Sequence, residues 1–238
     1  MIQLLNASGI HNKATCVLAS DRPWNKGMVE ALCLRTDFDF VLVSDHKDLT
    51  LLKLTAINPK LVFFPHWSHR IDESIYERFE CVIFHMTDLP FGRGGSPLQN
   101  LIVRGISETK ITALRCVSEM DAGPVYLKKP LSLYGSAEEI FLRASEVIKD
   151  MIVEMLVKMP KSVPQTGAPV VFKRRKPSDG DLASVQSLEQ VFDWIRMLDA
   201  DGYPNAYLTV GPFKIEFTRA SKKTDQVLAD VRISLLQK

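Results

Sequence analysis

Short apolar runs alternate with amphipathic segments along the first two thirds of the chain. The runs have the length of buried strands, and the segments between them carry apolar residues at helical spacing. Strands are predicted at residues 14–20, 38–44, 61–65, 81–84, 110–117 and 125–133, and helices at residues 24–34, 45–57, 96–104 and 136–159. Alternation of this kind predicts βαβ units and a parallel sheet.

The helix at residues 136–159 has the clearest signals. Ser136 and Glu139 have the spacing of a capping box, which marks a helix start. Apolar residues then recur on one face from Ile140 to Leu156. Such a stripe indicates core packing rather than cofactor binding.

A boundary is predicted in the proline-flanked segment at residues 160–169. The prediction is a catalytic domain at residues 1–160 and a small extension at residues 161–238. In the extension we expect a helix at residues 187–198 and a hairpin formed by residues 206–210 and 213–219, with a Gly-Pro turn between them.

The composition limits the partners that we expect. The 238 residues are 46% hydrophobic and carry a net charge of +2, which suits one globular domain or a large plus a small unit. Because nucleic-acid proteins carry clustered basic charge, this balance predicts no nucleic-acid partner. The basic run at residues 173–176 is interpreted as a solvated turn.

The sequence also predicts a cytoplasmic protein without a membrane partner. No apolar run approaches the ~18 residues of a membrane span, and the N-terminus lacks the layout of a secretory signal. The four cysteines show no C-x-x-C pairing, which is typical of reduced thiols in the cytosol.

One stretch combines several signals of chemistry. A buried strand ends at His85, a glycine-rich loop follows at residues 89–95, and Ser96 is expected to cap a helix with Pro97 at its first position. Open α/β sheets bind their ligands at the carboxyl ends of strands. The stretch is therefore the candidate active site.

The same stretch resembles the signature of formyltransferases that use 10-formyltetrahydrofolate, H-x-[ST]-x-L-P-x-x-R-G-[GA]-x-P, with His85 and Thr87 at its first conserved positions. The family's D-x-G-P element has its counterpart at Asp121. The resemblance implies a Rossmann-like, mostly parallel sheet with a small C-terminal α+β extension. It also implies that 10-formyltetrahydrofolate is the co-substrate.

His85 and Asp121 are the expected catalytic pair. Formyl transfer to an amine requires removal of a proton and stabilisation of an oxyanion. An imidazole suits the proton transfer, and a carboxylate would orient it. The family has Asn two residues before the histidine, where this chain has Ile83, so protonated His85, Thr87 or a backbone amide is left as the oxyanion donor.

The resemblance also implies binding residues. Those expected at the folate are Trp67, Ser68, Ile71, Leu89 and Met120. From the chemistry of the residues themselves, the acceptor is expected to contact Asp88, Gly92, Arg93 and Tyr203. Arg93 could bind a phosphate or brace its loop, and Tyr203 could stack on a base or pack in a core.

A metal site is not expected. His66 and His69 form an H-x-x-H element, but no third ligand follows at a useful spacing, and catalytic zinc requires three protein ligands.

Within the family, the stretch most resembles sugar N-formyltransferases. The expected reaction is formylation of the 4-amino group of a nucleotide-linked 4-amino-4,6-dideoxy sugar, with UDP-4-amino-4,6-dideoxy-N-acetyl-altrosamine of the pseudaminic acid pathway as the substrate and a homodimer as the assembly. The alternatives are methionyl-tRNA formyltransferase, formyltetrahydrofolate hydrolase and a catalytically impaired folate-binding relative. The charge balance and short C-terminal part weigh against the tRNA enzyme.

Overall fold

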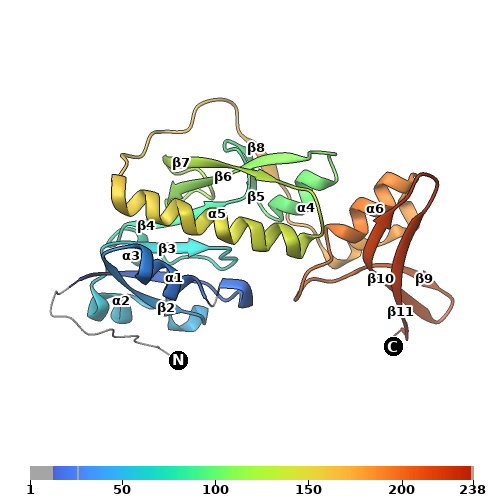
Figure 1. Ribbon diagram of the computed structural model, residues 1–238, viewed down its shortest axis with the longest axis horizontal. Helices are drawn as coiled ribbons and strands as arrows, with labels where there is room; N and C mark the ends of the chain where they lie inside the picture. Colours follow the sequence, from blue (N-terminus) through green and yellow to red (C-terminus); the bar gives the residue numbers. More distant parts are fainter. Residues whose placement is uncertain (1–12, 26, 237–238) are drawn as a thin grey trace. The chain divides into compact units, whose positions relative to one another are not determined.

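The computed structural model describes residues 13–25 and 27–236 (Figure 1). Its strands are β1 (Ala14–Ala19), β2 (Phe38–Val43), β3 (Val62–Pro65), β4 (Cys81–His85), β5 (Phe91–Gly94), β6 (Glu108–Arg115), β7 (Val125–Ser132), β8 (Val170–Phe172), β9 (Ala206–Val210), β10 (Phe213–Lys222) and β11 (Val227–Leu235). Its helices are α1 (Met28–Arg35), α2 (Leu51–Ile57), α3 (Glu73–Tyr76), α4 (Pro97–Ile102), α5 (Ala137–Lys158) and α6 (Leu188–Arg196).

The main sheet has the strand order β2-β1-β3-β4-β6-β7. β1 is parallel to β2 and β3, and β3 is parallel to β4. β6 runs antiparallel to β4. The chain between antiparallel strands does not have to cross back along the sheet, as it must between parallel strands. The predicted α/β fold with a mostly parallel sheet is confirmed, with the antiparallel pairing of β4 and β6 as an addition.

The chain divides into two compact units. The first comprises Met1–Arg93, Lys110–Leu131 and Ala144–Val170, and the second comprises Gly94–Thr109, Ser132–Arg143 and Val171–Lys238. These units follow spatial compactness rather than a single cut in the chain. The division into residues 1–160 and 161–238 stays a prediction.

The core of the first unit consists of strand residues and one face of α5. Val17 and Phe63 are completely buried, as are Ile148 and Ile152 on the helix. These helix residues belong to the stripe that the sequence predicted as core. Burial also raises the pKa of the Cys16 thiol to about 12, which keeps this side chain neutral in the interior.

The start of α5 has the predicted capping box. The Ser136 backbone N–H donates to the Glu139 carboxylate at 2.7 Å, and the Glu139 N–H donates to the Ser136 hydroxyl at 3.3 Å. Two N–H groups that the helix leaves unpaired are thereby satisfied.

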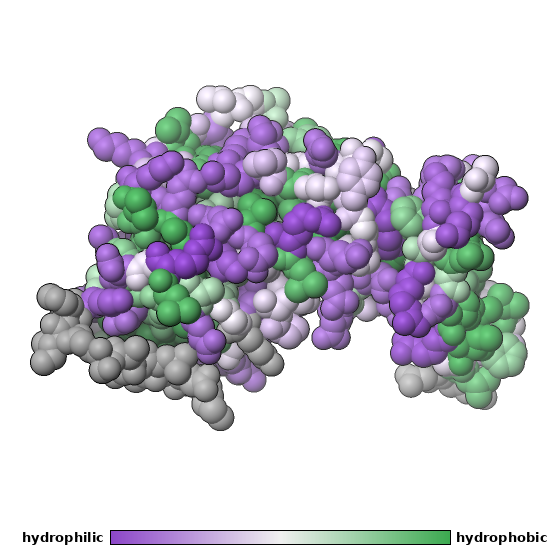
Figure 2. All heavy atoms as spheres, in the orientation of Figure 1, coloured by the Kyte–Doolittle hydropathy of each residue, from purple (hydrophilic) through white to green (hydrophobic). Residues whose placement is uncertain are grey.

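The second unit contains a three-stranded antiparallel sheet in the order β11-β10-β9. It confirms the predicted hairpin and adds β11, which pairs Ile233 with Ile215 and Val231 with Phe217. Figure 2 shows hydrophobic residues gathered over this sheet, where Ile233 and Val231 are exposed.

Two local predictions near the central stretch are corrected. The expected glycine-rich loop contains a strand, β5, that pairs with β8. Ser96 precedes α4, but its hydroxyl accepts a hydrogen bond from the Arg175 N–H at 3.0 Å and does not cap the helix. A capping residue normally has an extended backbone, whereas Ser96 has a left-handed φ of 50°.

None of the described helices is both long enough and apolar enough to cross a membrane.

The packing of α5 predicts different effects for two leucines on that helix. Leu156 is 6% exposed and Leu142 is 47% exposed. Leu156→Ala should lower the free energy of unfolding by about 2–5 kcal/mol because it leaves a cavity. Leu142→Ala should change it by less than about 1 kcal/mol. Urea unfolding measures both, and equal losses would contradict the packing of this face.

Candidate functional site

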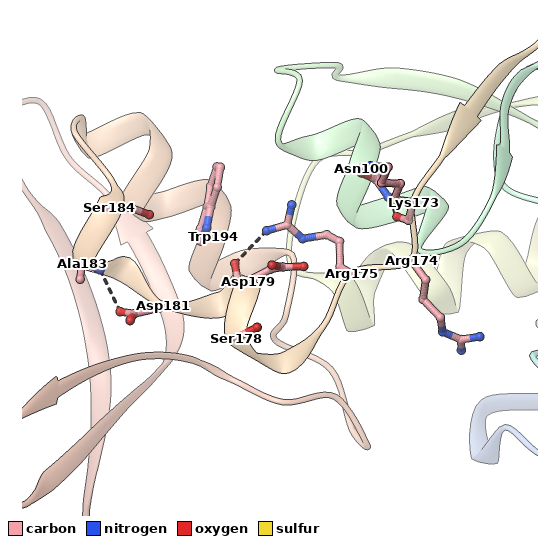
Figure 3. A pocket seen from close by; sticks show the side chains of 10 residues that line it. All are labelled: Asn100, Lys173, Arg174, Arg175, Ser178, Asp179, Asp181, Ala183, Ser184 and Trp194. Atoms are coloured by element: carbon pink, nitrogen blue, oxygen red, sulfur yellow. Dashed lines mark hydrogen bonds between the residues drawn. The ribbon is translucent and has the colours of Figure 1, made fainter.

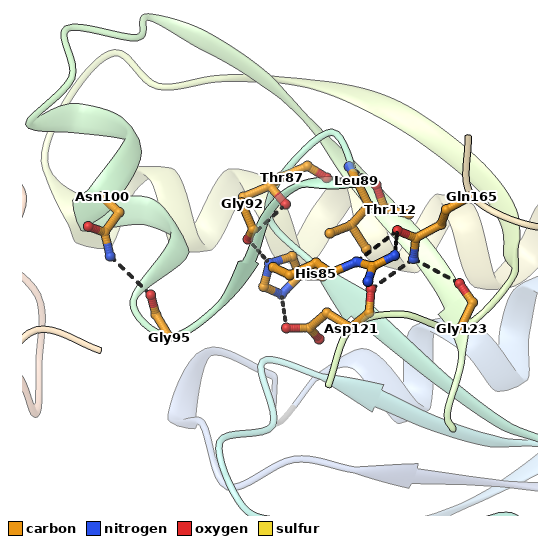
Figure 4. A network of polar contacts seen from close by, with 11 residues as sticks. His85, Thr87, Leu89, Gly92, Gly95, Asn100, Thr112, Asp121, Gly123 and Gln165 are labelled. Atoms are coloured by element: carbon orange, nitrogen blue, oxygen red, sulfur yellow. Dashed lines mark hydrogen bonds and ion pairs between the residues drawn. The ribbon is translucent and has the colours of Figure 1, made fainter. Parts of the chain in front are cut away.

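His85 is the last residue of β4 and is almost completely buried. Its strand is held between β3 on one side and β6 on the other. The ring is thus attached to the middle of the sheet, where the backbone has little freedom. Figure 4 shows the polar groups around it.

Both ring nitrogens of His85 face a partner. Nδ1 lies 3.6 Å from the Asp121 carboxylate, and Nε2 donates to the Gly92 carbonyl oxygen at 2.7 Å (Figure 4). A carbonyl only accepts hydrogen bonds, so in this contact Nε2 carries the proton. The structure therefore brings together the two side chains that the sequence predicted as a catalytic pair.

The Asp121 turn has an unusual backbone. Asp121 has a φ of 53°, a left-handed conformation that residues other than glycine seldom adopt. Two residues later, a Cβ on Gly123 would lie 1.8 Å from the Arg115 carbonyl oxygen. Only glycine permits this approach, which keeps the turn close to the end of β6.

Two buried threonines fix the backbone after His85. Thr87 donates its hydroxyl proton to the Gly92 carbonyl at 3.3 Å. Thr112 donates to the Thr87 carbonyl at 2.6 Å and accepts from the Leu89 N–H at 3.4 Å. The sequence does not point to Thr112, because a threonine within a strand gives no signal of its own.

Arg93 is held by protein groups. Its Nε and Nη2 donate to the Gln165 side-chain oxygen at 3.2 and 2.9 Å, and Nη1 pairs with Glu119 at 3.1 Å. Of the two interpretations of Arg93, this geometry favours bracing. The sequence does not point to Gln165, because this residue lies in a segment that the prolines mark as a boundary.

The residues expected at the folate divide into two groups. Ile71 belongs to the hydrophobic cluster that includes Cys116, and Trp67 and Ile83 pack against this cluster. Leu89 is also buried, whereas Met120 and Ser68 are exposed.

The expected folate wall contains one group that suits a polar ligand. The Trp67 indole N–H is buried and, within the described part of the chain, has no hydrogen-bond partner. A buried donor of this kind costs free energy unless a partner accepts from it. Trp67 thus fits the predicted role at a polar heterocycle, which stays a prediction.

Asp88 forms ion pairs with two lysines, Lys128 at 2.5 Å and Lys110 at 2.9 Å. Burial by itself raises the pKa of Asp88, but hydrogen bonds from both lysines outweigh it and hold the pKa below its usual value. Lys128 also donates to the Leu89 carbonyl. The carboxylate therefore fixes the turn after His85.

The H-x-x-H element does not form a joint site. His66 contacts the Ser145 hydroxyl at 3.3 Å, and burial lowers the pKa of His66 to about 3. His69 stacks on His46 instead. Among residues 13–25 and 27–236, no three histidine, cysteine, aspartate or glutamate side chains are placed to bind a metal ion.

The second unit contains a groove of about 520 Å³ (Figure 3). It is lined by Asn100, Lys173, Arg174, Arg175, Ser178, Asp179, Asp181, Ala183, Ser184 and Trp194. Arg175 lies over the Trp194 ring at 5.5 Å and donates to the Asp179 carbonyl at 2.8 Å. Tyr203, also in this unit, stacks on Phe141 at a ring distance of 5.3 Å.

A solved structure, the methionyl-tRNA formyltransferase from Clostridium thermocellum, is similar over almost the whole chain. It is 44% identical, has a TM-score of 0.91, and the match covers 93% of this chain and 99% of that chain. The chain belongs to the formyltransferase family. The predicted relationship to one-carbon transferases that use 10-formyltetrahydrofolate is thereby confirmed.

Further comparisons agree with this assignment. The family model described as "Methionyl-tRNA formyltransferase, C-terminal domain" matches residues 177–234. The methionyl-tRNA formyltransferase of Thermodesulfovibrio yellowstonii is 27% identical over 157 residues, 63% of this chain and 51% of that relative. This formyltransferase chain thus spans about half the length of such curated relatives.

HypX from Aquifex aeolicus, solved in complex with tetrahydrofolic acid, shares the fold. Its TM-score is 0.73 at 16% identity, and the match covers 88% of this chain and 38% of that chain. At this identity the likeness concerns the fold alone.

Two predictions are wrong. The nucleotide-sugar reaction is overturned because the 44% identical structure and the matching curated relatives are named methionyl-tRNA formyltransferases. The exclusion of a nucleic-acid partner fails on the same finding. It rested on the near-neutral net charge and on the interpretation of the basic run at residues 173–176 as a solvated turn. The homodimer stays a prediction.

The Asp88 ion pairs predict a pH-dependent contribution to stability. Because its folded pKa is lowered, the contribution should be present above the unfolded pKa of ~3.9 and lost as the pH falls through the folded pKa. Asp88→Asn should therefore cost less than about 1 kcal/mol at neutral pH, since this side chain is 42% exposed.

Urea unfolding of the wild type and of Asp88→Asn at several pH values measures this difference. The exposed Asp225→Asn is the matched control. A difference between wild type and Asp88→Asn that persists at pH 2 would contradict the assignment.

Proposed function

We propose that the chain transfers a formyl group from 10-formyltetrahydrofolate to the amino group of methionyl-tRNA. The observation that carries the proposal is the buried His85 at the end of β4, with Asp121 at one ring nitrogen and Gly92 at the other. The choice of acceptor rests on the names of the relatives, above all the 44% identical structure.

His85 suits the proton transfer. An amine that attacks a formyl carbon must lose a proton, and an imidazole can take it near neutral pH. Asp121 lies where its carboxylate can stabilise the positive charge that the ring then gains. Because Nε2 donates to Gly92, it must release that carbonyl or exchange its proton before it can accept one from a substrate.

Because Ile83 cannot donate a hydrogen bond to the oxyanion, another group near His85 must do so. The Ile83 side chain packs on the hydrophobic cluster, and an isoleucine side chain has no hydrogen to donate. Protonated His85 and the Thr87 hydroxyl remain the side-chain donors at this strand end. Both contact Gly92, so movement of this one carbonyl would release both donors together.

The groove of the second unit supports an RNA acceptor. Lys173 and Arg174 line the groove and are exposed, and Arg175 lies over the Trp194 ring at the groove wall. Clustered lysine and arginine attract phosphates, and aromatic rings stack on unpaired bases. A groove of this composition suits a single-stranded end of an RNA.

Replacement of His85 tests the chemistry. His85→Asn should lower turnover of methionyl-tRNA by roughly 10²–10⁴-fold because the proton acceptor is removed. His46→Asn, at an exposed histidine, is the matched control and should retain activity. The measurement is formylmethionyl-tRNA formed from 10-formyltetrahydrofolate, with free formate measured in the same samples.

The outcomes separate the acceptors. Formyl transfer to methionyl-tRNA that depends on His85 supports the proposal. Release of formate without an amine product would indicate a hydrolase, and the absence of both products in the wild type would reject the transfer.

Replacement of basic residues tests the RNA interaction. Lys173→Ala with Arg174→Ala should weaken tRNA binding, and the slope of log K against log salt should decrease by about 1 for each phosphate that is no longer neutralised. Fluorescence anisotropy from low to moderate salt measures the slope. Lys223→Ala, at an exposed residue outside the groove, is the control. An unchanged slope in the double variant would show that the groove is not part of the RNA-binding surface.

A further inference from the structure

Gln165 differs in burial from its neighbours in the chain. Residues 163–171 are exposed apart from Gln165, which is half-buried. Two backbone contacts already anchor this segment. Val163 and Val125 exchange hydrogen bonds at 2.8 Å, and the Val170 N–H donates to the Pro90 carbonyl at 3.1 Å. The Gln165 side chain is therefore not needed to attach the segment, and its inward direction calls for another explanation.

The amide of Gln165 is fully used. Its nitrogen donates to the backbone carbonyls of Asp121 at 2.8 Å and Gly123 at 2.9 Å (Figure 4). Its oxygen accepts two hydrogen bonds from Arg93. An amide provides two donor hydrogens and one acceptor oxygen, and here each has a partner.

These contacts connect the two groups that hold the His85 ring. On one side, Gln165 fixes the backbone of Asp121, whose carboxylate faces Nδ1. On the other, it fixes Arg93, which follows Gly92 in the chain, and the Gly92 carbonyl accepts from Nε2. One side chain thus couples both partners of the ring.

The coupling matters because the Asp121 backbone is left-handed. A residue other than glycine keeps such a conformation only where its surroundings enforce it. Within the turn, the Ala122 N–H donates to the Glu119 carbonyl at 3.3 Å. Gln165 adds a restraint from outside the turn by binding the Asp121 and Gly123 carbonyls.

We propose that Gln165 is a positioning residue, which holds the Asp121 turn and the Gly92–Arg93 strand segment at the distances that place His85 for proton transfer. The kinetic part of this proposal rests on the proposed formyl transfer. The positioning itself is a property of the folded chain and is measurable without turnover.

Gln165→Glu distinguishes the donor function of the amide from its acceptor function. The carboxylate has nearly the same shape and still accepts from Arg93, but it has no hydrogen to donate to the Asp121 and Gly123 carbonyls. Gln165→Ala removes both functions and serves if the charged variant does not fold. Gln226→Ala, at an exposed glutamine, is the matched control.

The first measurement is the NMR signal of the His85 ring, assigned by its loss in His85→Asn. Gln165→Glu and Gln165→Ala should shift the ring ¹⁵N resonances, because Asp121 moves relative to Nδ1. Gln226→Ala should leave them unchanged. This measurement tests the positioning of His85 even if the wild type formylates no acceptor.

The second measurement is steady-state turnover of methionyl-tRNA, at a temperature where circular dichroism shows each variant fully folded. The kcat of Gln165→Glu should fall by about 10–100-fold, the scale of an ångström misplacement, with the KM for the tRNA little changed. A residue that only adds stability would leave the kcat of folded molecules unaltered.

The outcomes are distinct. Shifted His85 resonances together with a lower kcat support the proposal. Unchanged resonances in a folded Gln165 variant overturn it, whatever the kcat. If the wild type itself is inactive, the proposed function fails, and the His85 resonances alone decide the role of Gln165.

Discussion

The site depends on the contacts at the two nitrogens of His85. The ring is attached to a central strand, but its orientation is set by Asp121 and Gly92, which come from two other segments. Nε2 donates a hydrogen bond to Gly92, and Nδ1 lies 3.6 Å from the Asp121 carboxylate. Only one of the two flipped orientations of the ring places each nitrogen at its partner, and proton transfer at a defined atom requires such an orientation. Thr87 and Arg93 then serve to keep these two partners in place.

Charge in this chain has to be considered locally. The net charge of +2 is almost neutral, yet three consecutive basic residues, Lys173, Arg174 and Arg175, line one groove. Attraction between exposed charges fades beyond a Debye length of about 8–10 Å, so a phosphate responds to the nearest cluster and not to the sum over the chain. For this reason a balanced composition did not exclude an RNA partner.

The sequence identified the catalytic candidates because each is tied to a local pattern. His85 ends an apolar run, and Asp121 opens a turn that must contain Gly123. Gln165 has no such pattern. Its contacts reach across about forty residues to Asp121 and seventy to Arg93, and only folding brings these segments together. A glutamine between prolines is therefore interpreted from sequence as part of a linker.

The sequence by itself determined the α/β class, the strands of the main sheet and the capped start of α5, because periodicity and capping act between residues close in the chain. The tertiary structure decided the antiparallel direction of β6, the strand at Phe91–Gly94 and the partners of Arg93 and Gln165. These features depend on hydrogen bonds between distant segments. A backbone or side-chain donor takes the acceptor that the fold places within reach, and no short window of sequence contains both.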